Sequence, residues 1–324
     1  MDIEAYRNEE LWSPKPYQAL KRSRLNYLEP MAVNTSQVES LTSYLTRLAE
    51  SHSVLVSTLM TREIAPILTN DNTEYGSKRG LNALFNCGVA INGTGEIVEL
   101  FLDSLVRLTL NKKLSALTLL TLRGHFSDRE LLSKSKTWCP HCYEDWRKSQ
   151  KTIYEPLLWT FRSVEVCPIH KQPLQTKCPN CDREIPWFTS RSRVGYCCYC
   201  QQWLGSMCQS KNSNHLVLNK RSLVKSIWIA NILGDLIASP KTRSLSKSSI
   251  HLSIREVINI TQKNNIAAFA RTFNLPKNTV WMWCQDKTIP QLKHILNICY
   301  ALNISLVDFL VQNIAILNKI LRSN

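Results

Sequence analysis

Eight side chains that commonly bind metal ions stand in four pairs between residues 139 and 200. Two residues separate the members of each pair, a spacing that allows one tight turn to direct both side chains toward a single ion. Because two such turns complete a tetrahedron, the four pairs predict two zinc sites. Taken in chain order, the ligands are Cys139, Cys142, Cys167 and His170 for the first site, and Cys178, Cys181, Cys197 and Cys200 for the second.

Both predicted sites are saturated by protein side chains. A catalytic zinc ion keeps one position open for water, whereas three thiolates with an imidazole, or four thiolates, leave none. The two Zn²⁺ cofactors are therefore expected to be structural, and no catalytic residue is predicted. Two alternatives to metal binding are disfavoured. Ordinary buried thiols do not explain four pairs with the same spacing, and a reducing compartment disfavours disulfides. One ligand stays open, because Cys198 stands beside Cys197 and could replace it.

The net charge of +15 is concentrated in the C-terminal half. Residues 1–170 contain 20 Lys or Arg against 19 Asp or Glu, whereas residues 171–324 contain 20 against 6. Clustered cations favour a polyanion, and nucleic acid is preferred to a membrane surface because no amphipathic helix shows a polar face dominated by Lys and Arg. No signal peptide and no apolar run of about 18 residues is evident, so a cytoplasmic protein without a membrane partner is expected.

The elements around the zinc region indicate a mainly α fold. Ser36 to Glu39 resembles a capping box that starts a helix running to about His52, and a second helix is expected from Val54 to Leu68, ending near Pro66. Further helices are expected over 96–110 and 114–122. The predicted division is an N-terminal arm (1–30), a helical N-terminal domain (31–137), a double zinc-ribbon or knuckle region (138–205), a connecting helix (206–238), a basic Ser-rich linker (239–252) and a helix-turn-helix bundle (253–324).

The C-terminal segment fits a helix-turn-helix. Ala270 is small where two helices would cross, Asn274 tolerates a left-handed turn, and Val280 and Trp283 would point inward. The later helices resemble those of Cro-type phage repressor domains. A recognition helix over 277–286 would then present polar side chains to nucleic acid, although a bundle used only for protein contact is the alternative. The candidate contacts are Lys277, Asn278, Thr279, Trp281, Met282, Gln285 and Lys287.

Several motifs, in order, resemble those of the TniQ/TnsD family of bacterial transposon target-selection proteins. The likeness covers about residues 29–203, and the ordered set is far more specific than a single cysteine pair. The motifs are Glu29-Pro30, then Glu39-Ser-Leu-Thr-Ser-Tyr44-Leu-Thr-Arg47-Leu-Ala-Glu-Ser-His52, then Trp138-Cys-Pro-His-Cys142, Tyr154-Glu-Pro-Leu-Leu-Trp159 and Val166-Cys-Pro-Ile-His170.

This resemblance implies a non-enzymatic adaptor in a bacterial cytoplasm. Family members select a target and recruit an AAA+ ATPase transposition regulator of the TnsC type. Some read target DNA themselves, and others follow a CRISPR Cascade effector with its guide RNA; no motif here decides between these routes. The part presented to the ATPase would include Tyr44 and Arg47, and the arm residues Trp12 and Tyr17 are expected to dock on a protein surface. A transcription regulator of helix-turn-helix type is the alternative, and a metalloenzyme is disfavoured because no acidic cluster stands beside an unsaturated ligand set.

Overall fold

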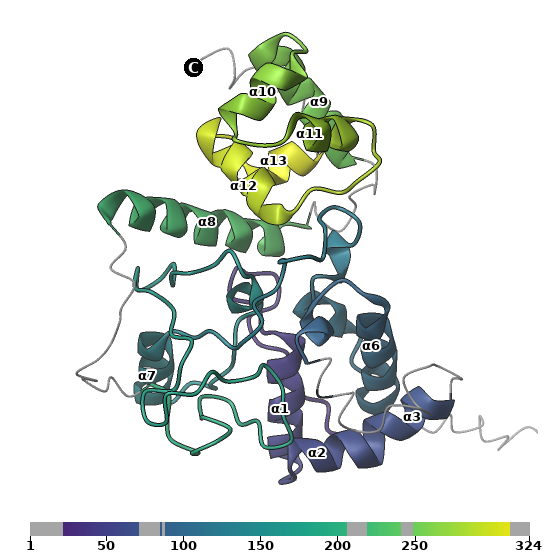
Figure 1. Ribbon diagram of the computed structural model, residues 1–324. Helices are drawn as coiled ribbons and strands as arrows, with labels where there is room; N and C mark the ends of the chain where they lie inside the picture. The colour runs from purple at the N-terminus through teal and green to yellow at the C-terminus, as the bar shows by residue number, and fades with distance from the viewer. Residues whose placement is uncertain (1–21, 71–84, 86–87, 206–218, 241–248, 312–324) are drawn as a thin grey trace, which may run out of the picture.

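A computed structural model describes residues 22–70, 85, 88–205, 219–240 and 249–311. Within these ranges the fold is mainly helical, and only isolated β-bridges occur where two extended segments meet. Figure 1 shows three layers, with a helical bundle above, a single long helix in the middle, and the N-terminal helices with the cysteine-rich loops below. No helix in the described ranges is long and apolar enough to cross a membrane.

The first helix is the centre of the lower layer. Helix α1 (Leu41–Ser51) is buried along most of its length. Its N-terminus is capped by Ser40, whose hydroxyl accepts a hydrogen bond from the backbone N–H of Ser43 at 3.3 Å. The predicted capping box at Ser36 to Glu39 is therefore wrong, because the Glu39 carboxylate lies in the core and accepts from the Ser43 hydroxyl at 2.8 Å.

The second predicted helix forms but does not end at Pro66. Its turns are α2 (Val56–Leu59), a π-helical turn η1 (Met60–Ile64) and α3 (Ala65–Asn70). The wider π turn ends two residues before Pro66 and contains Arg62, whose carbonyl a regular helix would place against the proline ring. Residues 71–84 and 86–87, which follow this helix, lie outside the described residues.

Helix α6 (Glu96–Thr109) follows the short 3₁₀ turn η2 (Ala90–Asn92) and agrees with the prediction for residues 96–110. The helix expected over 114–122 is instead two 3₁₀ turns, η3 (Lys112–Leu117) and η4 (Leu120–Leu122). Thr118 separates them: its hydroxyl donates to the Ser115 carbonyl at 3.0 Å and accepts from the Leu120 N–H at 3.4 Å. Such local hydrogen bonds compete with helix continuation.

The cysteine-rich segment contains little regular structure beyond α7 (Pro140–Lys148) and the 3₁₀ turn η5 (Leu157–Thr160). The hydrophobic side chains of residues 157–166 are buried, Trp159 and Phe161 completely. Tyr199 is an exception, because it remains 46% exposed with the Arg183 guanidinium 5.2 Å from its ring.

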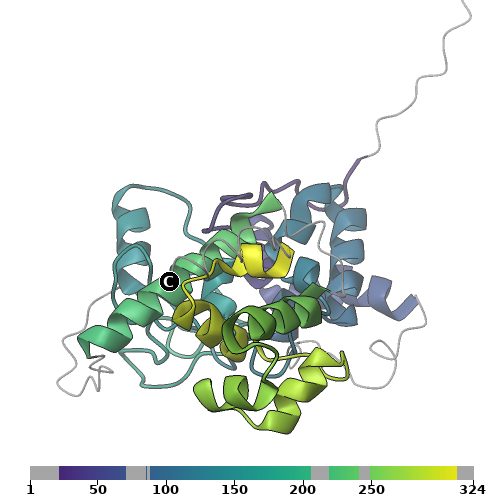
Figure 2. The ribbon, with the colours of Figure 1, turned by 90° about the horizontal axis from the view of Figure 1, so that it is seen from above.

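Helix α8 (Lys220–Ala238) is the middle layer. It contacts η5 below, and above it the Trp228 ring meets the Tyr300 ring at 5.1 Å. Val224 on this helix is 55% exposed. Seen from above, one end of α8 projects beyond the bundle (Figure 2).

The upper layer is the C-terminal bundle. Its described helices are α9 (Ser249–Gln262), α10 (Ile266–Thr272), α11 (Lys277–Cys284), α12 (Leu292–Ala301) and α13 (Leu306–Val311). Helix α9 begins inside the segment predicted as a linker, of which residues 241–248 lie outside the described part. Two contacts attach the bundle to the lower layer: the Ser127 N–H donates to the Pro290 carbonyl at 2.9 Å, and Lys293 pairs with Glu130 at 2.8 Å.

Candidate metal centre and nucleic-acid interface

The first cluster joins the start of α7 to a turn 25 residues further along the chain. The Cys142 sulfur lies 3.6 Å from the Cys167 sulfur and 3.3 Å from Nδ1 of His170. Nδ1 of His170 is also 3.5 Å from the Cys139 sulfur and 3.7 Å from the Cys167 sulfur. The four predicted ligands of the first site therefore converge on one point.

The second cluster brings two loop turns together. The Cys178 sulfur lies 3.6 Å from the Cys200 sulfur, and the Cys181 sulfur lies 3.8 Å from the Cys197 sulfur. All four ligand atoms lie within 4.8 Å of one another, as they do in the first cluster. The eight ligands are thus grouped into the two predicted sets.

Three of the four turns repeat the same backbone geometry. In each, the N–H of the fourth residue after the first cysteine donates to the carbonyl of that cysteine. The bonds run from Lys171 to Cys167 at 2.8 Å, from Asp182 to Cys178 at 2.9 Å, and from Gln201 to Cys197 at 3.0 Å. The three donor residues all have positive φ, at 53°, 54° and 57°. A residue with a left-handed backbone conformation therefore follows the second ligand in each of these turns. This geometry directs both ligands of the turn to the same side.

These distances fit a tetrahedral zinc ion. Sulfur atoms about 2.3 Å from a shared ion stand about 3.8 Å apart at tetrahedral angles, close to the observed 3.6 and 3.8 Å between sulfurs. Thiolates with imidazole are ligands that zinc prefers. Both clusters can therefore hold a metal ion, and the donor sets are compatible with zinc.

An outer carboxylate supports the first cluster. Nε2 of His170 lies 2.9 Å from the carboxylate of Asp145, on α7. Burial lowers the pKa of His170, but hydrogen bonds with Cys167 and Asp145 outweigh it, so that the pKa is raised. The contact directs Nδ1 toward the three sulfurs. Asp145 was not predicted; its position three residues after Cys142 on a helix is the sequence signal that could have identified it.

In the second cluster the environment favours a thiolate at Cys200. Burial raises the pKa of this thiol, but hydrogen bonds from Asn180 and from the Gln202 backbone outweigh burial and lower the pKa to about 6. Cys198 takes no part in the cluster. It is buried elsewhere, with a hydrogen bond to the Thr189 side chain, and burial raises its pKa. The structure therefore groups Cys197, and not Cys198, with the other three ligands.

One buried ion pair stabilises α1, and a second stabilises the cysteine-rich segment. Arg47 donates to the Glu39 carboxylate at 2.6 Å, and Lys136 donates to Glu155 at 2.7 Å with both side chains 3% exposed. Backbone bonds join the same elements, since the Ser40 N–H donates to the Glu155 carbonyl at 2.9 Å. Burial raises the pKa of Glu39, and Arg47 opposes this effect.

The expected partner contacts on α1 do not fit this geometry. Tyr44 is completely buried and its hydroxyl donates to the Leu28 carbonyl at 3.1 Å, while the Arg47 side chain is 10% exposed and faces Glu39. Both side chains stabilise the interior, because the polar groups of a buried helix require internal partners. Trp12 and Tyr17, the other expected partner contacts, lie outside the described residues.

The C-terminal bundle has the expected helix-turn-helix geometry at α10 and α11. Ala270 is buried where these helices meet, Asn274 has φ 51°, and Val280, Trp283 and Cys284 face inward. The predicted contact residues Lys277, Asn278, Trp281, Gln285 and Lys287 are exposed, and Thr279 and Met282 are partly exposed. The Lys287 ammonium lies 4.6 Å from the centre of the Trp281 ring.

Comparison with known families gives one result. The TniQ family model matches residues 30–174. The matched segment begins before α1 and includes the whole first cluster, whereas the second cluster and the bundle lie beyond it. The match supports the TniQ family and, with it, a general role in target selection for transposition. No curated protein shows significant similarity to the chain.

Proposed function

We propose that this protein is a non-enzymatic target-selection adaptor of a bacterial DNA transposon. It would connect target DNA, or a guide-RNA effector complex of the CRISPR Cascade type, to an AAA+ transposition regulator in the cytoplasm. The observation that carries this proposal is the TniQ match over residues 30–174, together with the buried contacts that make this segment one folded unit with the first cluster.

The metal clusters support a role without catalysis. Each offers four protein ligands, so that a tetrahedral ion bound there has no position for water or substrate. Bound zinc would supply folding energy to a segment that has two short helical elements and many loops. The clusters then hold the adaptor in shape, and its binding surfaces lie elsewhere.

The test is reconstitution with an AAA+ ATPase transposition regulator of the TnsC type. The purified chain is mixed with this ATPase, nucleotide and duplex DNA, and complexes are captured by cross-linking and size-exclusion chromatography. We expect a complex that needs nucleotide. If no complex forms with nucleotide and DNA both supplied, the adaptor proposal is wrong.

A second experiment separates the two targeting routes. The chain is co-purified with a CRISPR Cascade effector complex, with and without loaded guide RNA. A stoichiometric complex would indicate the guided route. Protection of a discrete duplex by the protein alone would instead indicate that it reads the site itself.

A stand-alone transcription regulator is the second candidate, because α10 and α11 have helix-turn-helix geometry and α11 has an exposed polar face. Such a regulator binds a palindromic operator as a dimer. A dimer that protects two half-sites about one helical turn apart, with no binding to the ATPase, would favour this candidate over the adaptor.

A further inference from the structure

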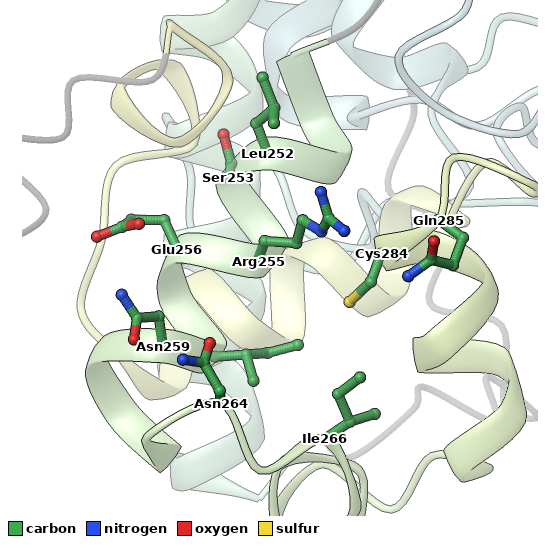
Figure 3. Close-up of a pocket in the computed structure, with 10 residues that line it drawn as sticks. Leu252, Ser253, Arg255, Glu256, Asn259, Asn264, Ile266, Cys284 and Gln285 are labelled. Carbon is green, nitrogen blue, oxygen red and sulfur yellow. The ribbon is translucent and has the colours of Figure 1, made fainter.

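A groove of about 550 Å³ opens between α9 and the C-terminal end of α11 (Figure 3). Its polar lining comes from Arg255 and Asn259 on α9, Asn264 in the turn after α9, and Gln285 after α11, with the Cys284 thiol among them. None of these residues belongs to the predicted nucleic-acid interface except Gln285. The groove therefore extends that interface onto a second helix.

Arg255 is the distinctive residue of this groove. It is exposed, and within the described part of the chain no ion pair or hydrogen bond of its guanidinium is found. In Figure 3 it projects from α9 toward Cys284 and Gln285. Glu256, the acid that also lines the groove, projects to the other side of α9. The cation thus faces the groove without a neutralising partner.

The groove continues the outward face of α11. Gln285 lies both in this face and in the groove wall, and Trp281, which is 40% exposed, lies one helical turn before it. A strand that meets α11 through Trp281 and Gln285 would next pass α9 at Arg255 and Asn259. The bundle favours an anion, because residues 249–311 contain six Lys or Arg against three Asp or Glu.

We propose that this groove binds a backbone phosphate of the DNA strand whose bases face α11. Arg255 supplies the charge, since a guanidinium fork matches two phosphate oxygens, and the amides of Asn259 and Asn264 supply neutral donors. This inference rests on the proposed DNA role of α11. It adds a contact that fixes the position of the duplex without reading its sequence.

The experiment measures binding of a fluorescein-labelled, mixed-sequence DNA duplex by anisotropy over a salt series. Arg255→Gln is expected to weaken binding about five- to tenfold and to reduce the slope of log affinity against log salt by about 1. Arg255→Lys keeps the charge and should keep the slope. Arg191→Gln, which removes the same charge from an exposed loop beside the second cluster, should change neither.

The outcomes separate this inference from the functions on which it rests. If Arg255→Gln binds the duplex as Arg191→Gln does, while Trp281→Ala binds it more weakly, the phosphate site in the groove is refuted and α11 remains a DNA-binding helix. If the wild-type protein binds no duplex, both the phosphate site and the DNA-binding role of α11 are refuted, and ATPase capture still tests the adaptor proposal. An Arg255→Gln variant that loses ATPase capture but not DNA would make the groove a protein surface. Thermal unfolding of each variant verifies that an exposed substitution leaves the fold intact.

Discussion

Cys197 and Cys198 are adjacent, yet the structure predicts opposite results when each is replaced by serine. The Cys197 sulfur lies 3.8 Å from the Cys181 sulfur inside the second cluster, whereas Cys198 is buried beside Thr189 and outside it. Each substitution exchanges one buried thiol for a hydroxyl of similar size. The difference between the two variants therefore isolates the metal–ligand bond from the cost of changing a buried side chain.

The expected magnitude follows from the ligand number. Structural zinc contributes about 10–16 kcal/mol in small zinc domains, so each of four ligands accounts for about 2.5–4 kcal/mol. Cys197→Ser should lose at least this amount and unfold the loops of the second cluster. Cys198→Ser should cost about 1 kcal/mol, because the new hydroxyl can keep a hydrogen bond with Thr189.

Zinc content and urea unfolding measure these effects in the full chain. We expect two zinc ions per chain in the wild type and in Cys198→Ser, and one in Cys197→Ser, which matches the two clusters. Tryptophan fluorescence should report the loss of structure, since Trp187 lies buried in the same segment. Loss of zinc from Cys198→Ser with full zinc in Cys197→Ser would refute the ligand assignment, and full zinc in both would refute the cluster.

Three other substitutions test polar contacts that stabilise the fold or the first cluster. Lys136→Met leaves the Glu155 carboxylate buried without its cation, so urea titration should show that the free energy of unfolding falls by about 3–5 kcal/mol. The double variant Lys136→Met/Glu155→Gln should largely restore it. Equal losses in the single and the double variant would contradict the pairing. Asp145→Asn should weaken zinc binding at the first cluster about 10- to 100-fold in chelator competition, with an unchanged circular dichroism spectrum, and unaltered affinity would exclude its supporting role. The hydrogen bond with Lys293 lowers the pKa of Glu130, so this contact stabilises the fold above the ordinary pKa of 4.5 and the stabilisation is lost as pH falls through the lowered value. Lys293→Gln should therefore flatten the decline in stability toward acid pH, measured at low salt. Identical pH profiles of the variant and the wild type would argue against this contact.

The metal clusters and the helix-turn-helix could be predicted from the sequence because both are encoded locally. A pair of ligands two residues apart closes its own turn, and the turns at Cys167, Cys178 and Cys197 repeat one backbone geometry. Likewise, Asn274 supplies the left-handed turn, and the spacing of Val280 and Trp283 sets the inward face of α11. Neither feature needs information from distant parts of the chain.

The interior of the N-terminal part depends on distant contacts and was not predicted. Glu39 has the spacing of a capping box, but its carboxylate pairs with Arg47 because the loop before η5 covers this side of α1 and excludes water. The start of α9 at Ser249 was missed because serine and basic residues are common in linkers as well as in first helical turns. Local patterns do not distinguish these cases, since the deciding interactions are tertiary.

The burial of α1 changes how substitutions in the TniQ-matched segment should be interpreted. Tyr44 and Arg47 lie in the motif that resembles the target-selection family, and exposed positions there would suggest direct contact with an ATPase. Their side chains instead bond to Leu28 and Glu39 inside the protein. If Arg47→Ala reduced the proposed ATPase recruitment, the loss would follow from an uncompensated buried carboxylate and a smaller folded fraction. A true contact residue should lose recruitment at wild-type stability, so recruitment must be compared with the folded fraction before any surface is assigned.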